Sequence, residues 1–368
     1  MKYPSIISVC LLLFLRATAA DVKALSSGAK APNFNLEGTD GKRYSLQSFA
    51  SAKVLVIVFT ANHCPTAQAY EDRIKALVTD YKSKGVAVVA ISPNDPKSVR
   101  LDELGYTDLG DTKEEMRIRA KNKKFNFPYL YDGDNSKASM AYGPVATPQV
   151  FIFDKDRKLK YSGRIDDAEK PGTAKVHDAR NAIEALLTGK PVAVAVTKTF
   201  GCSVKWPDKE ESVKKATLDW SKESVKLNPI DIAGIKNLLK NNSDTLKLIN
   251  VWATWCGPCV TEFPDFVTIN RMYRGREFEF ISISADKMTK KEKAFAFLKG
   301  KQASNKNFIY KEQNMYELIE AVDKNWQGAL PYTILVGSGG KILYSKQGTI
   351  EPAEMKKAIV EILGRFYD

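Results

Sequence analysis

The sequence predicts an α/β protein of two tandem domains of one kind, each with a central mixed β-sheet flanked by helices. Three observations predict this fold class. The chain repeats one order of elements twice. Within each copy, continuous apolar runs alternate with helical patterns, which is typical of a partly parallel sheet covered on both faces. Each copy then ends in two strands joined by a turn, which makes the sheet mixed.

The first element of each copy is an apolar run that ends at a cysteine. KVLVIVFTANHC (53–64) matches LKLINVWATWC (246–256), and a helical pattern follows both cysteines. A short continuous run rich in Val, Ile and Leu indicates a buried strand. Both cysteines are therefore expected in the turn between a buried strand and a helix.

The later elements also match in pairs. A second apolar strand is followed in each copy by a helical region, a two-stranded hairpin and a last helix. The second strands are 86–95 and 278–287, the hairpins are 146–163 and 329–346, and the last helices are 178–189 and 352–364.

A proline stands at the start of each hairpin, Pro148 in the first copy and Pro331 in the second. Proline donates no hydrogen bond to a sheet, so a central strand tolerates it only for a reason. A cis peptide bond at the edge of the site is such a reason. We therefore expect cis bonds before both prolines.

The composition of the chain suggests where the two domains meet. Residues 21–206 are assigned to the first domain and 228–368 to the second. The segment 207–227 is polar and has no clear period, so we interpret it as a linker. NPIDIAGIKNLLKNN (228–242) is interpreted as the first helix of the second domain, with Pro229 in its first turn.

Residues 1–20 have the pattern of a secretory signal peptide: an early lysine, an apolar run over 6–15 and small residues up to Ala20. That run is about half of the roughly 20 residues that a membrane-spanning helix needs, so an uncleaved anchor is the weaker alternative. Cys10 leaves with the signal. The protein is thus expected to be exported, to the periplasm or cell envelope, and soluble after cleavage.

The formal net charge is +13 at pH 7. The lysines are scattered among acidic residues and form no long block of one sign, which indicates an ordinary solvated surface. Weak association with an anionic membrane surface is the alternative. Export and the absence of a nucleic-acid-binding motif in the sequence argue against nucleic acid as a partner.

The motif CGPC at 256–259 is suited to exchange between a dithiol and a disulfide. At the start of a helix, backbone N–H groups and the helix dipole would favour the thiolate of Cys256. Cys259, one turn later on the same face, could then attack the mixed disulfide. The alternatives are a static disulfide and a zinc site, but zinc needs two further ligands, and the histidines His63 and His177 are both in the other half. We expect no cofactor and no metal.

The second half resembles the thioredoxin superfamily, specifically the exported TlpA/ResA-like thiol–disulfide oxidoreductases. The matching residues are VWATWCGPCVTEFPDF (251–266) and ALPYT (329–333). The resemblance implies a thioredoxin fold with Cys256 as the nucleophile, Cys259 as the resolving cysteine and Pro331 as the cis-proline, beside which an extended substrate segment would pair. The Gly-Pro pair between the cysteines matches thioredoxin, whose couple lies at about −270 mV, so the expected direction is reduction.

Glu262 stands three residues after Cys259, where exported members of this group carry a glutamate. Its carboxylate could take the proton of Cys259 during resolution. A solvent-facing helix glutamate is the alternative. Cytosolic thioredoxins carry a buried aspartate six residues before the first cysteine, where this chain has Asn250, and Pro264 would kink the helix just past the site.

The first copy keeps only one cysteine of the pair. Cys64 aligns with Cys256, whereas Ala67 takes the place of the second cysteine. Thr66 supplies a nearby hydroxyl, and His63 stands directly before Cys64. Adjacent residues at a helix start need not face each other, so an ion pair between His63 and Cys64 is the less favoured arrangement.

The first half resembles the AhpC/TSA-type redoxin domains, through GAKAPNFNLEGTDGKRYSL (28–46) and TPQVFIFD (147–154). Peroxiredoxins carry a proline seven residues and a threonine or serine three residues before the peroxidatic cysteine. This chain has Ile57 and Ala61 there, which puts peroxide activation in doubt. Arg164 is a candidate cation for the site.

The remaining cysteine, Cys202, lies in an extended run, TKTFGCSVKW (197–206), after the last helix of the first domain. A tail of this kind could fold back so that Cys202 resolves Cys64, provided that their Cα atoms approach within about 7 Å. An inert thiol and a cysteine linked to a partner are the alternatives. A copper site is disfavoured because Ala67 replaces the second cysteine that it would need.

These residues together predict an exported thiol–disulfide oxidoreductase. Its second domain would reduce disulfides in protein substrates through Cys256 and Cys259 and be recharged by a membrane or exported thiol donor. The first domain would cycle a disulfide between Cys64 and Cys202. The alternatives are a thiol-dependent peroxidase recharged by the second domain, and a redox-silent first domain that presents client proteins.

Overall fold

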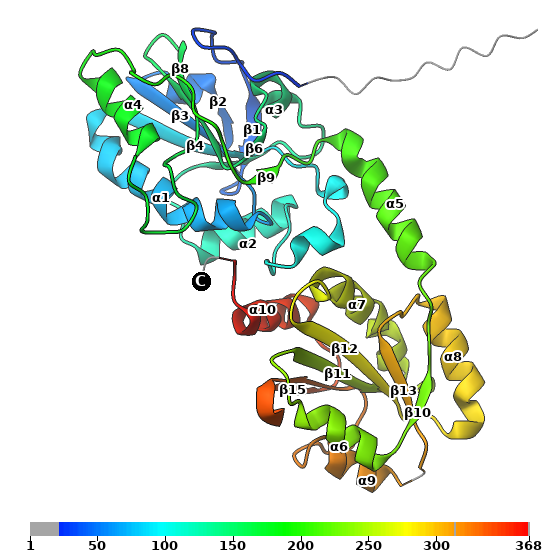
Figure 1. The fold of residues 1–368 in the computed structure, drawn as a ribbon. Helices are drawn as coiled ribbons and strands as arrows, with labels where there is room; N and C mark the ends of the chain where they lie inside the picture. The colour runs from blue at the N-terminus through cyan, green and yellow to red at the C-terminus, as the bar shows by residue number, and fades with distance from the viewer. Residues whose placement is uncertain (1–21, 313, 367–368) are drawn as a thin grey trace, which may run out of the picture.

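The computed structural model describes residues 22–312 and 314–366. They form two α/β domains that are joined by one helix (Figure 1). No helix among these residues is both long and apolar enough to span a membrane. The predicted signal peptide, 1–20, lies outside the described residues.

The first sheet has the strand order β2-β1-β5-β4-β3-β7-β8. Its centre is β3 (Val54–Phe59), which pairs in parallel with β4 (Val86–Ser92) and antiparallel with β7 (Gln149–Phe153). The central strand is buried along its whole length, as its unbroken apolar sequence predicts. The outer strands are β1 (Asn35–Gly38), β2 (Arg43–Ser45), β5 (Tyr129–Tyr131) and β8 (Leu159–Gly163).

Helices cover both faces of this sheet. On one face, α1 (Pro65–Tyr81), α2 (Lys113–Asn122) and α4 (Asp178–Leu187) pack on the inward side chains of β3 and β4. On the other face lie α3 (Lys137–Tyr142) and residues near the start of the described chain. Four short 3-10 helices complete the domain: η1 (Leu46–Phe49), η2 (Lys82–Lys84), η3 (Pro96–Ser98) and η4 (Leu101–Leu104).

The second sheet has the order β10-β13-β12-β11-β14-β15 and the same arrangement of central strands. Its strands are β10 (Asn228–Ile230), β11 (Leu246–Trp252), β12 (Phe278–Ser284), β13 (Lys306–Tyr310), β14 (Tyr332–Val336) and β15 (Ile342–Gln347). One face packs on α7 (Gly257–Tyr273), α8 (Lys291–Gly300) and α10 (Pro352–Leu363), and the other on α6 (Ile232–Lys240) and α9 (Met315–Val322). The short helices η6 (Met288–Lys290) and η7 (Ser338–Gly340) lie in its loops. The predicted strands, hairpins and last helices of both copies are confirmed.

The predicted linker is more regular than its polar sequence suggested. After η5 (Pro207–Lys209), residues Glu210–Ser221 form the helix α5, which spans the two domains in Figure 1. Acidic residues in its first turn and a lysine one turn later stabilise such a polar helix locally. The buried Trp220 at its end lies against Arg271 of the second domain. The absence of an apolar period therefore did not exclude a helix that bridges two domains.

The predicted helix over 228–242 also begins later than expected. Asn228–Ile230 is the edge strand β10, which pairs in parallel with β13. Pro229 fits an edge strand because one side of that strand needs no N–H donor. The helix α6 starts after Asp231, whose carboxylate caps it by accepting the N–H of Gly234 at 2.8 Å.

A two-stranded sheet crosses the first domain beside its site. β6 (Ala146–Thr147) pairs antiparallel with β9 (Cys202–Ser203), which lies in the run after α4. We call residues 195–205 the strap. Backbone bonds tie its start to Ser162 of β8, and its end to Asp95, so that the strap lies across the domain.

The domains contact each other through the loop after β4. Leu101 and Leu104 of η4 pack against the core of the second domain. Thr107 accepts a hydrogen bond from the hydroxyl of Tyr273 at 2.8 Å, and Asp108 forms an ion pair with Arg365 at 2.6 Å. These contacts fix the first domain to the end of α7 and to the residues after α10.

Gly105 lies close to the backbone of the second domain. A Cβ atom added there would lie 3.1 Å from the backbone oxygen of Met272. Met272 and Tyr273 are the last residues of α7, which begins at Gly257. The first domain is therefore docked on the end of α7 that is opposite to its start.

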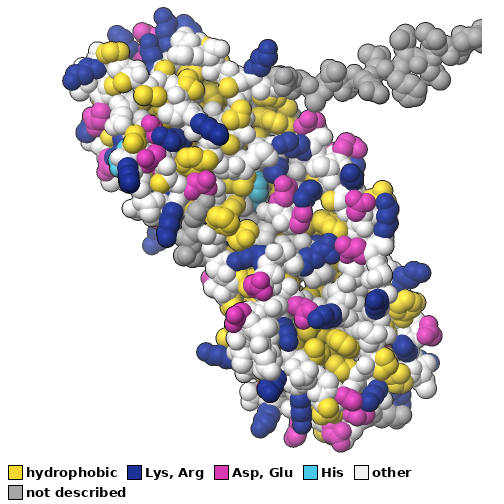
Figure 2. Space-filling view, viewed as in Figure 1, with side chains coloured by type: hydrophobic (Ala, Val, Ile, Leu, Met, Phe, Trp, Pro, Cys, Tyr) yellow, Lys and Arg dark blue, Asp and Glu magenta, His cyan; other side chains and the backbone are white. Residues whose placement is uncertain are grey.

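Charged side chains of both signs are mixed over both domains on the face shown in Figure 2. Lysine and arginine side chains lie among aspartate and glutamate side chains rather than in one block. Ion pairs such as Lys113 with Glu37 and Lys311 with Asp231 are spread over both domains. The net positive charge is thus distributed on this face rather than concentrated.

Candidate redox sites

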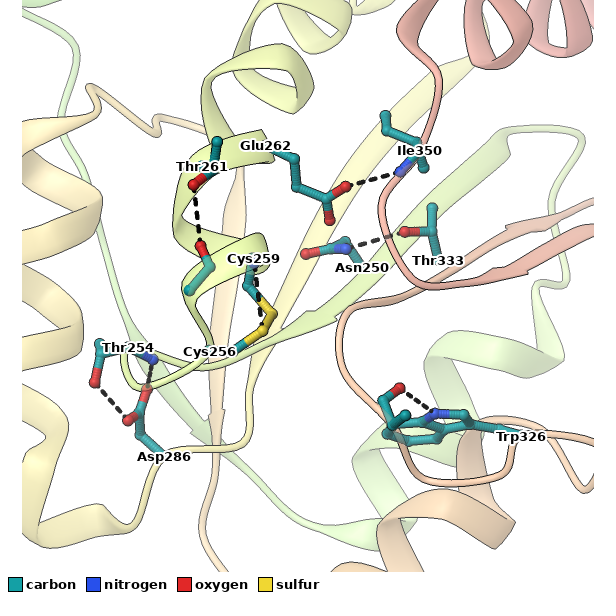
Figure 3. Close-up of a disulfide and its surroundings, with 12 residues drawn as sticks. Asn250, Thr254, Cys256, Cys259, Thr261, Glu262, Asp286, Trp326, Thr333 and Ile350 are labelled. Atoms are coloured by element: carbon teal, nitrogen blue, oxygen red, sulfur yellow. Dashed lines mark hydrogen bonds between the residues drawn. A yellow bond between two sulfur atoms is a disulfide. The ribbon is translucent and has the colours of Figure 1, made fainter.

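The second domain holds a disulfide between Cys256 and Cys259 at the start of α7, with a Cα–Cα distance of 5.3 Å. Cys256 is the N-cap residue of the helix, and its sulfur accepts the N–H of Cys259 at 3.3 Å. Pro258 fits the first turn because its missing N–H would have no helical partner. The loop before the helix is held by Thr254, which bonds Asp286 through both its N–H and its hydroxyl (Figure 3).

Both cysteines are largely buried, and Cys256 is the more exposed of the two. Cys256 is 6% exposed and Cys259 1% exposed. Trp255, directly before the disulfide, is 66% exposed, which is unusual for so large an apolar side chain. Trp252, three residues earlier, is fully buried. The first cysteine of the pair is therefore the one that a partner would meet, next to an exposed aromatic ring.

Glu262 points into the domain and not into solvent, so the alternative of a solvent-facing glutamate is wrong. It is 5% exposed, and its Oε2 accepts the backbone N–H of Ile350 at 2.9 Å (Figure 3). Burial raises the pKa of Glu262 to about 7, although the Ile350 N–H acts in the opposite direction. A carboxyl with this pKa can exchange a proton near neutral pH.

Pro331 directly precedes β14, which pairs with β11, the strand before the disulfide. The Leu330–Pro331 bond is cis, as predicted. Asn250 on β11, at the position of the thioredoxin aspartate, donates to the hydroxyl of Thr333 at 3.0 Å (Figure 3). Pro264 lies inside α7, as expected.

In the first domain, Cys64 has the same place that Cys256 has in the second. It is the N-cap residue of α1, and its sulfur accepts the N–H of Ala67 at 3.4 Å. The bond between Thr147 and Pro148 is cis, again as predicted. Cys64 is 0% exposed, and its thiol donates to the backbone oxygen of Thr147 at 3.1 Å.

Cys202 lies directly beside Cys64, although the two are free thiols in this structure. The antiparallel register places Cys202 opposite Thr147, and the N–H of Cys202 donates to the sulfur of Cys64 at 3.4 Å. Gly201 makes this approach possible. Its φ is +129°, and a Cβ atom there would lie 2.1 Å from the oxygen of Thr147.

The residue before Cys64, His63, is part of a buried ion pair. Nδ1 of His63 lies 2.5 Å from Oδ2 of Asp111, and both side chains are almost fully buried. Asp111 also accepts the backbone N–H groups of Asn62 and His63 and the amide of Asn94. Burial raises the pKa of Asp111, but the charge of His63 and these donors outweigh it, so that the pKa is lowered.

The interaction between His63 and Asp111 also affects the pKa values of His63 and Cys64. Burial lowers the pKa of His63, but the charge of Asp111 and its hydrogen bond outweigh burial and raise it. For Cys64, burial raises the pKa, yet a hydrogen bond from the Cys202 thiol, the charge of His63 and two backbone N–H groups bring it to about 6. The hydrogen bond with Cys64 and burial both raise the pKa of Cys202. Of the two thiols, Cys64 is therefore the more readily ionised.

Two residues suggested for the first site are engaged elsewhere. Thr66 does not bond Cys64, because its hydroxyl donates to Glu169 at 3.0 Å. Arg164 pairs with Asp178 of α4 at 2.8 Å and so supplies no cation to the sulfur. As expected, His63 forms no direct ion pair with Cys64 but pairs with Asp111.

Comparison with known families agrees with this geometry. A model described as the AhpC/TSA family matches residues 27–162, and a model described as Redoxin matches residues 236–361. The chain has two thioredoxin-like redoxin domains. The strand that precedes each candidate cysteine, the helix that follows it and the hairpin with its cis-proline thus recur in both redoxin domains.

Individual relatives of the redoxin domains match parts of the chain. The thiol-disulfide oxidoreductase ResA of Bacillus subtilis (strain 168) is 26% identical over 143 residues, which are 39% of this chain and 70% of that protein. The chloroplastic peroxiredoxin Q of Triticum aestivum is 26% identical over 141 residues, which are 37% of this chain and 58% of that protein. A solved hypothetical protein from Sinorhizobium meliloti 1021 is 32% identical over 50% of this chain and 96% of its own, with a TM-score of 0.44. The chain therefore spans little more than half of peroxiredoxin Q.

Asp111 is the residue of the redoxin sites that the sequence did not reveal. It lies 48 positions from His63, in a loop without a recognised motif. A buried histidine beside a cysteine needs a counter-charge, and this need was the only available signal. Among the described residues, no group of three or more His, Cys, Asp or Glu side chains is arranged to hold a metal ion.

Proposed function

We propose that this protein is an exported thiol–disulfide oxidoreductase that reduces disulfides in protein substrates through Cys256 and Cys259. The observation that carries the proposal is a disulfide at the start of α7 whose first cysteine is the more exposed one. A buried glutamate with a pKa of about 7, Glu262, lies one turn further along the same helix face.

In the reduced form, the helix N-terminus favours the thiolate of Cys256. This thiolate attacks a substrate disulfide, so that one substrate sulfur leaves as a thiolate and a mixed disulfide forms. Cys259 must then lose its proton to attack Cys256. Glu262 in its ionised form accepts that proton, and the second substrate sulfur leaves. The substrate gains two electrons, and the Cys256–Cys259 disulfide is restored.

The surface around the disulfide is suited to a protein substrate. Trp255 offers an exposed aromatic ring. An extended substrate segment would pair with the backbone beside the cis-proline Pro331, as the resemblance to the TlpA/ResA-like proteins implies. An external thiol donor, in the membrane or exported like this protein, would return the disulfide to the dithiol.

The test is a reduction assay with insulin as the protein disulfide and dithiothreitol as the electron source. We expect the wild-type chain to accelerate insulin reduction and Cys256→Ser to lose this acceleration, because no thiolate remains to form the mixed disulfide. Cys64→Ser is the matched control and should keep the acceleration. Equal loss in both variants would contradict the assignment of the reaction to the second domain.

A second candidate function, a Cys64–Cys202 redox couple in the first domain, is favoured by one observation. The antiparallel pairing of β6 with β9 aligns Cys202 with Thr147, whose oxygen already contacts the Cys64 thiol. By contrast, a peroxidase would need peroxide to reach Cys64, which is fully buried. Mass-spectrometric mapping of disulfides after mild oxidation should find Cys64 joined to Cys202. If both stay free, the redox-silent client-binding alternative gains support.

A further inference from the structure

The two redoxin domains expose opposite members of their cysteine pairs. In the second domain, the cysteine at the helix start, Cys256, is more exposed than its partner Cys259. In the first domain, the cysteine at the helix start, Cys64, is fully buried, whereas its neighbour Cys202 is partly exposed. A partner molecule can approach the first pair only from the side of Cys202.

The strap is what buries Cys64. The hydroxyl of Thr197 bonds Tyr161 and the N–H of Arg164, which anchors the start of the strap. Lys205 anchors its end, because its N–H donates to Asn94 at 2.9 Å and its ammonium pairs with Glu103. Between these anchors Gly201 and Ser203, on either side of Cys202, are exposed. Cys202 itself packs against Cys64 and is only partly buried, so the strap covers Cys64 and leaves part of Cys202 open to a partner.

The groups around Cys64 are suited to holding a leaving thiolate. Its sulfur accepts N–H groups from Ala67 and from Cys202 at 3.4 Å each, at the start of a helix. The charge of His63, which is paired with Asp111, also acts on this sulfur, and Lys205, paired with Glu103, lies on the strap. In thiol–disulfide exchange, the sulfur that forms the more stable thiolate leaves faster, and the accessible sulfur is the one attacked.

We propose that Cys202 is the sulfur that exchanges with a partner and that Cys64 is the buried resolving thiolate. This assignment rests on the Cys64–Cys202 couple proposed above. It inverts the roles that the repeat implies, because Cys64 occupies the nucleophile position of the second domain. The partner is a thiol compound or a cysteine-bearing protein that can reach the exposed part of the strap.

For reduction of the couple, a partner dithiol supplies the electrons. One partner thiolate attacks Cys202, the Cys64–Cys202 bond breaks, and Cys64 leaves as a thiolate. The second partner thiol, after losing its proton, attacks the mixed disulfide and releases Cys202, which takes up a proton. The partner is oxidised to a disulfide by two electrons. In the reverse direction, Cys202 carries the mixed disulfide and Cys64 resolves it.

The experiment uses the full chain with Cys256→Ser and Cys259→Ser, so that only the first domain reacts. After mild oxidation, glutathione is added, and the cysteine that carries glutathione is identified by mass spectrometry of peptides. We expect glutathione on Cys202. Glutathione on Cys64 would overturn the assignment.

A second measurement decides the assignment even if the disulfide does not form. In the same background, Cys64→Ser and Cys202→Ser are each reacted with an aromatic disulfide reagent under native conditions. We expect Cys202 in the first variant to react at least about tenfold faster than Cys64 in the second, because the strap keeps Cys64 covered. Faster reaction of Cys64 would overturn the inference. Circular dichroism of both variants checks that the first domain is folded.

Discussion

The two redox sites of this chain start from the same strand-to-helix turn and differ in where the second sulfur comes from. In the second domain it comes from the same helix, three residues later. In the first domain Ala67 fills that position, and the neighbouring sulfur comes from Cys202, 138 residues along the chain. The fold thus specifies the position of one sulfur strictly and leaves the source of the other open.

The buried charged groups near the two sites also differ. The second site has one buried carboxyl, Glu262, whose pKa is raised to about 7 by burial. The first has a buried pair, His63 with Asp111, in which each charge supports the other against burial. A buried carboxyl with a pKa of about 7 can accept and release a proton near neutral pH, whereas a fixed ion pair with a charged His63 favours the thiolate form of Cys64. Four substitutions would break or sharpen this comparison.

The largest effect is expected from Ala67→Cys, which gives the first domain the cysteine spacing of the second. The N–H of residue 67 already bonds Cys64 as that of Cys259 bonds Cys256. We expect Cys64 to pair with the new cysteine after mild oxidation and Cys202 to remain a free thiol. Peptide mapping with thiol labelling measures the pairing. A persistent Cys64–Cys202 bond would mean that the strap, and not the helix, determines the pairing.

Asp111→Asn removes the counter-charge of His63. Breaking a buried ion pair on one side costs about 3–5 kcal/mol, so the free energy of unfolding should fall by that order. The pKa of Cys64 should rise above about 6, because the imidazole loses its charge. Urea denaturation and thiolate absorbance against pH measure the two effects. Asp102→Asn, in an exposed pair with Arg100, is the control and should cost less than about 1 kcal/mol.

Glu262→Gln replaces the ionisable carboxyl of the second site with a neutral amide. The pKa of Glu262 is about 7 in the fold against 4.5 for a free side chain, so its contribution to stability is complete below pH 4.5 and is lost as pH rises through 7. Relative to the wild type, the glutamine variant should therefore gain on the order of 2 kcal/mol between pH 4.5 and pH 8, after allowance for solvent screening. Urea denaturation at both pH values tests this. A constant difference would show that Glu262 does not titrate in this range.

Gly201→Ala should have the smallest effect on stability and act locally. The added methyl group would overlap the backbone oxygen of Thr147, and the φ of +129° is unfavourable for alanine. We expect local opening of the strap to become easier by about 1–2 kcal/mol, which speeds labelling of Cys64 about 5–30-fold. Gly172→Ala, at φ +76° with no atom within 4 Å, is the control. Equal labelling in both variants would contradict the role of the strap.

Much of the fold followed from the repeat, because strands such as β3 and β11 are unbroken apolar runs whose burial depends on local sequence. The disulfide in CGPC was predictable because both of its cysteines lie in one short motif, three residues apart. Burial of Glu262 was not, because it depends on Ile350, 88 residues away. The counter-charge on Asp111 likewise comes from a distant loop, whereas the approach of Cys202 to Cys64 was one of the arrangements that the sequence suggested. Sequence patterns describe one element at a time, whereas these contacts depend on how loops pack.

The docking of the first domain on the far end of α7 has a kinetic consequence. Since α7 has 17 residues, the disulfide at its start lies about 25 Å from that interface. With the domains held in this way, electrons could pass between the two couples only when one molecule meets another. Such a transfer would be second order in protein, so its initial rate should rise about fourfold for each doubling of concentration, whereas an internal relay would follow the concentration itself.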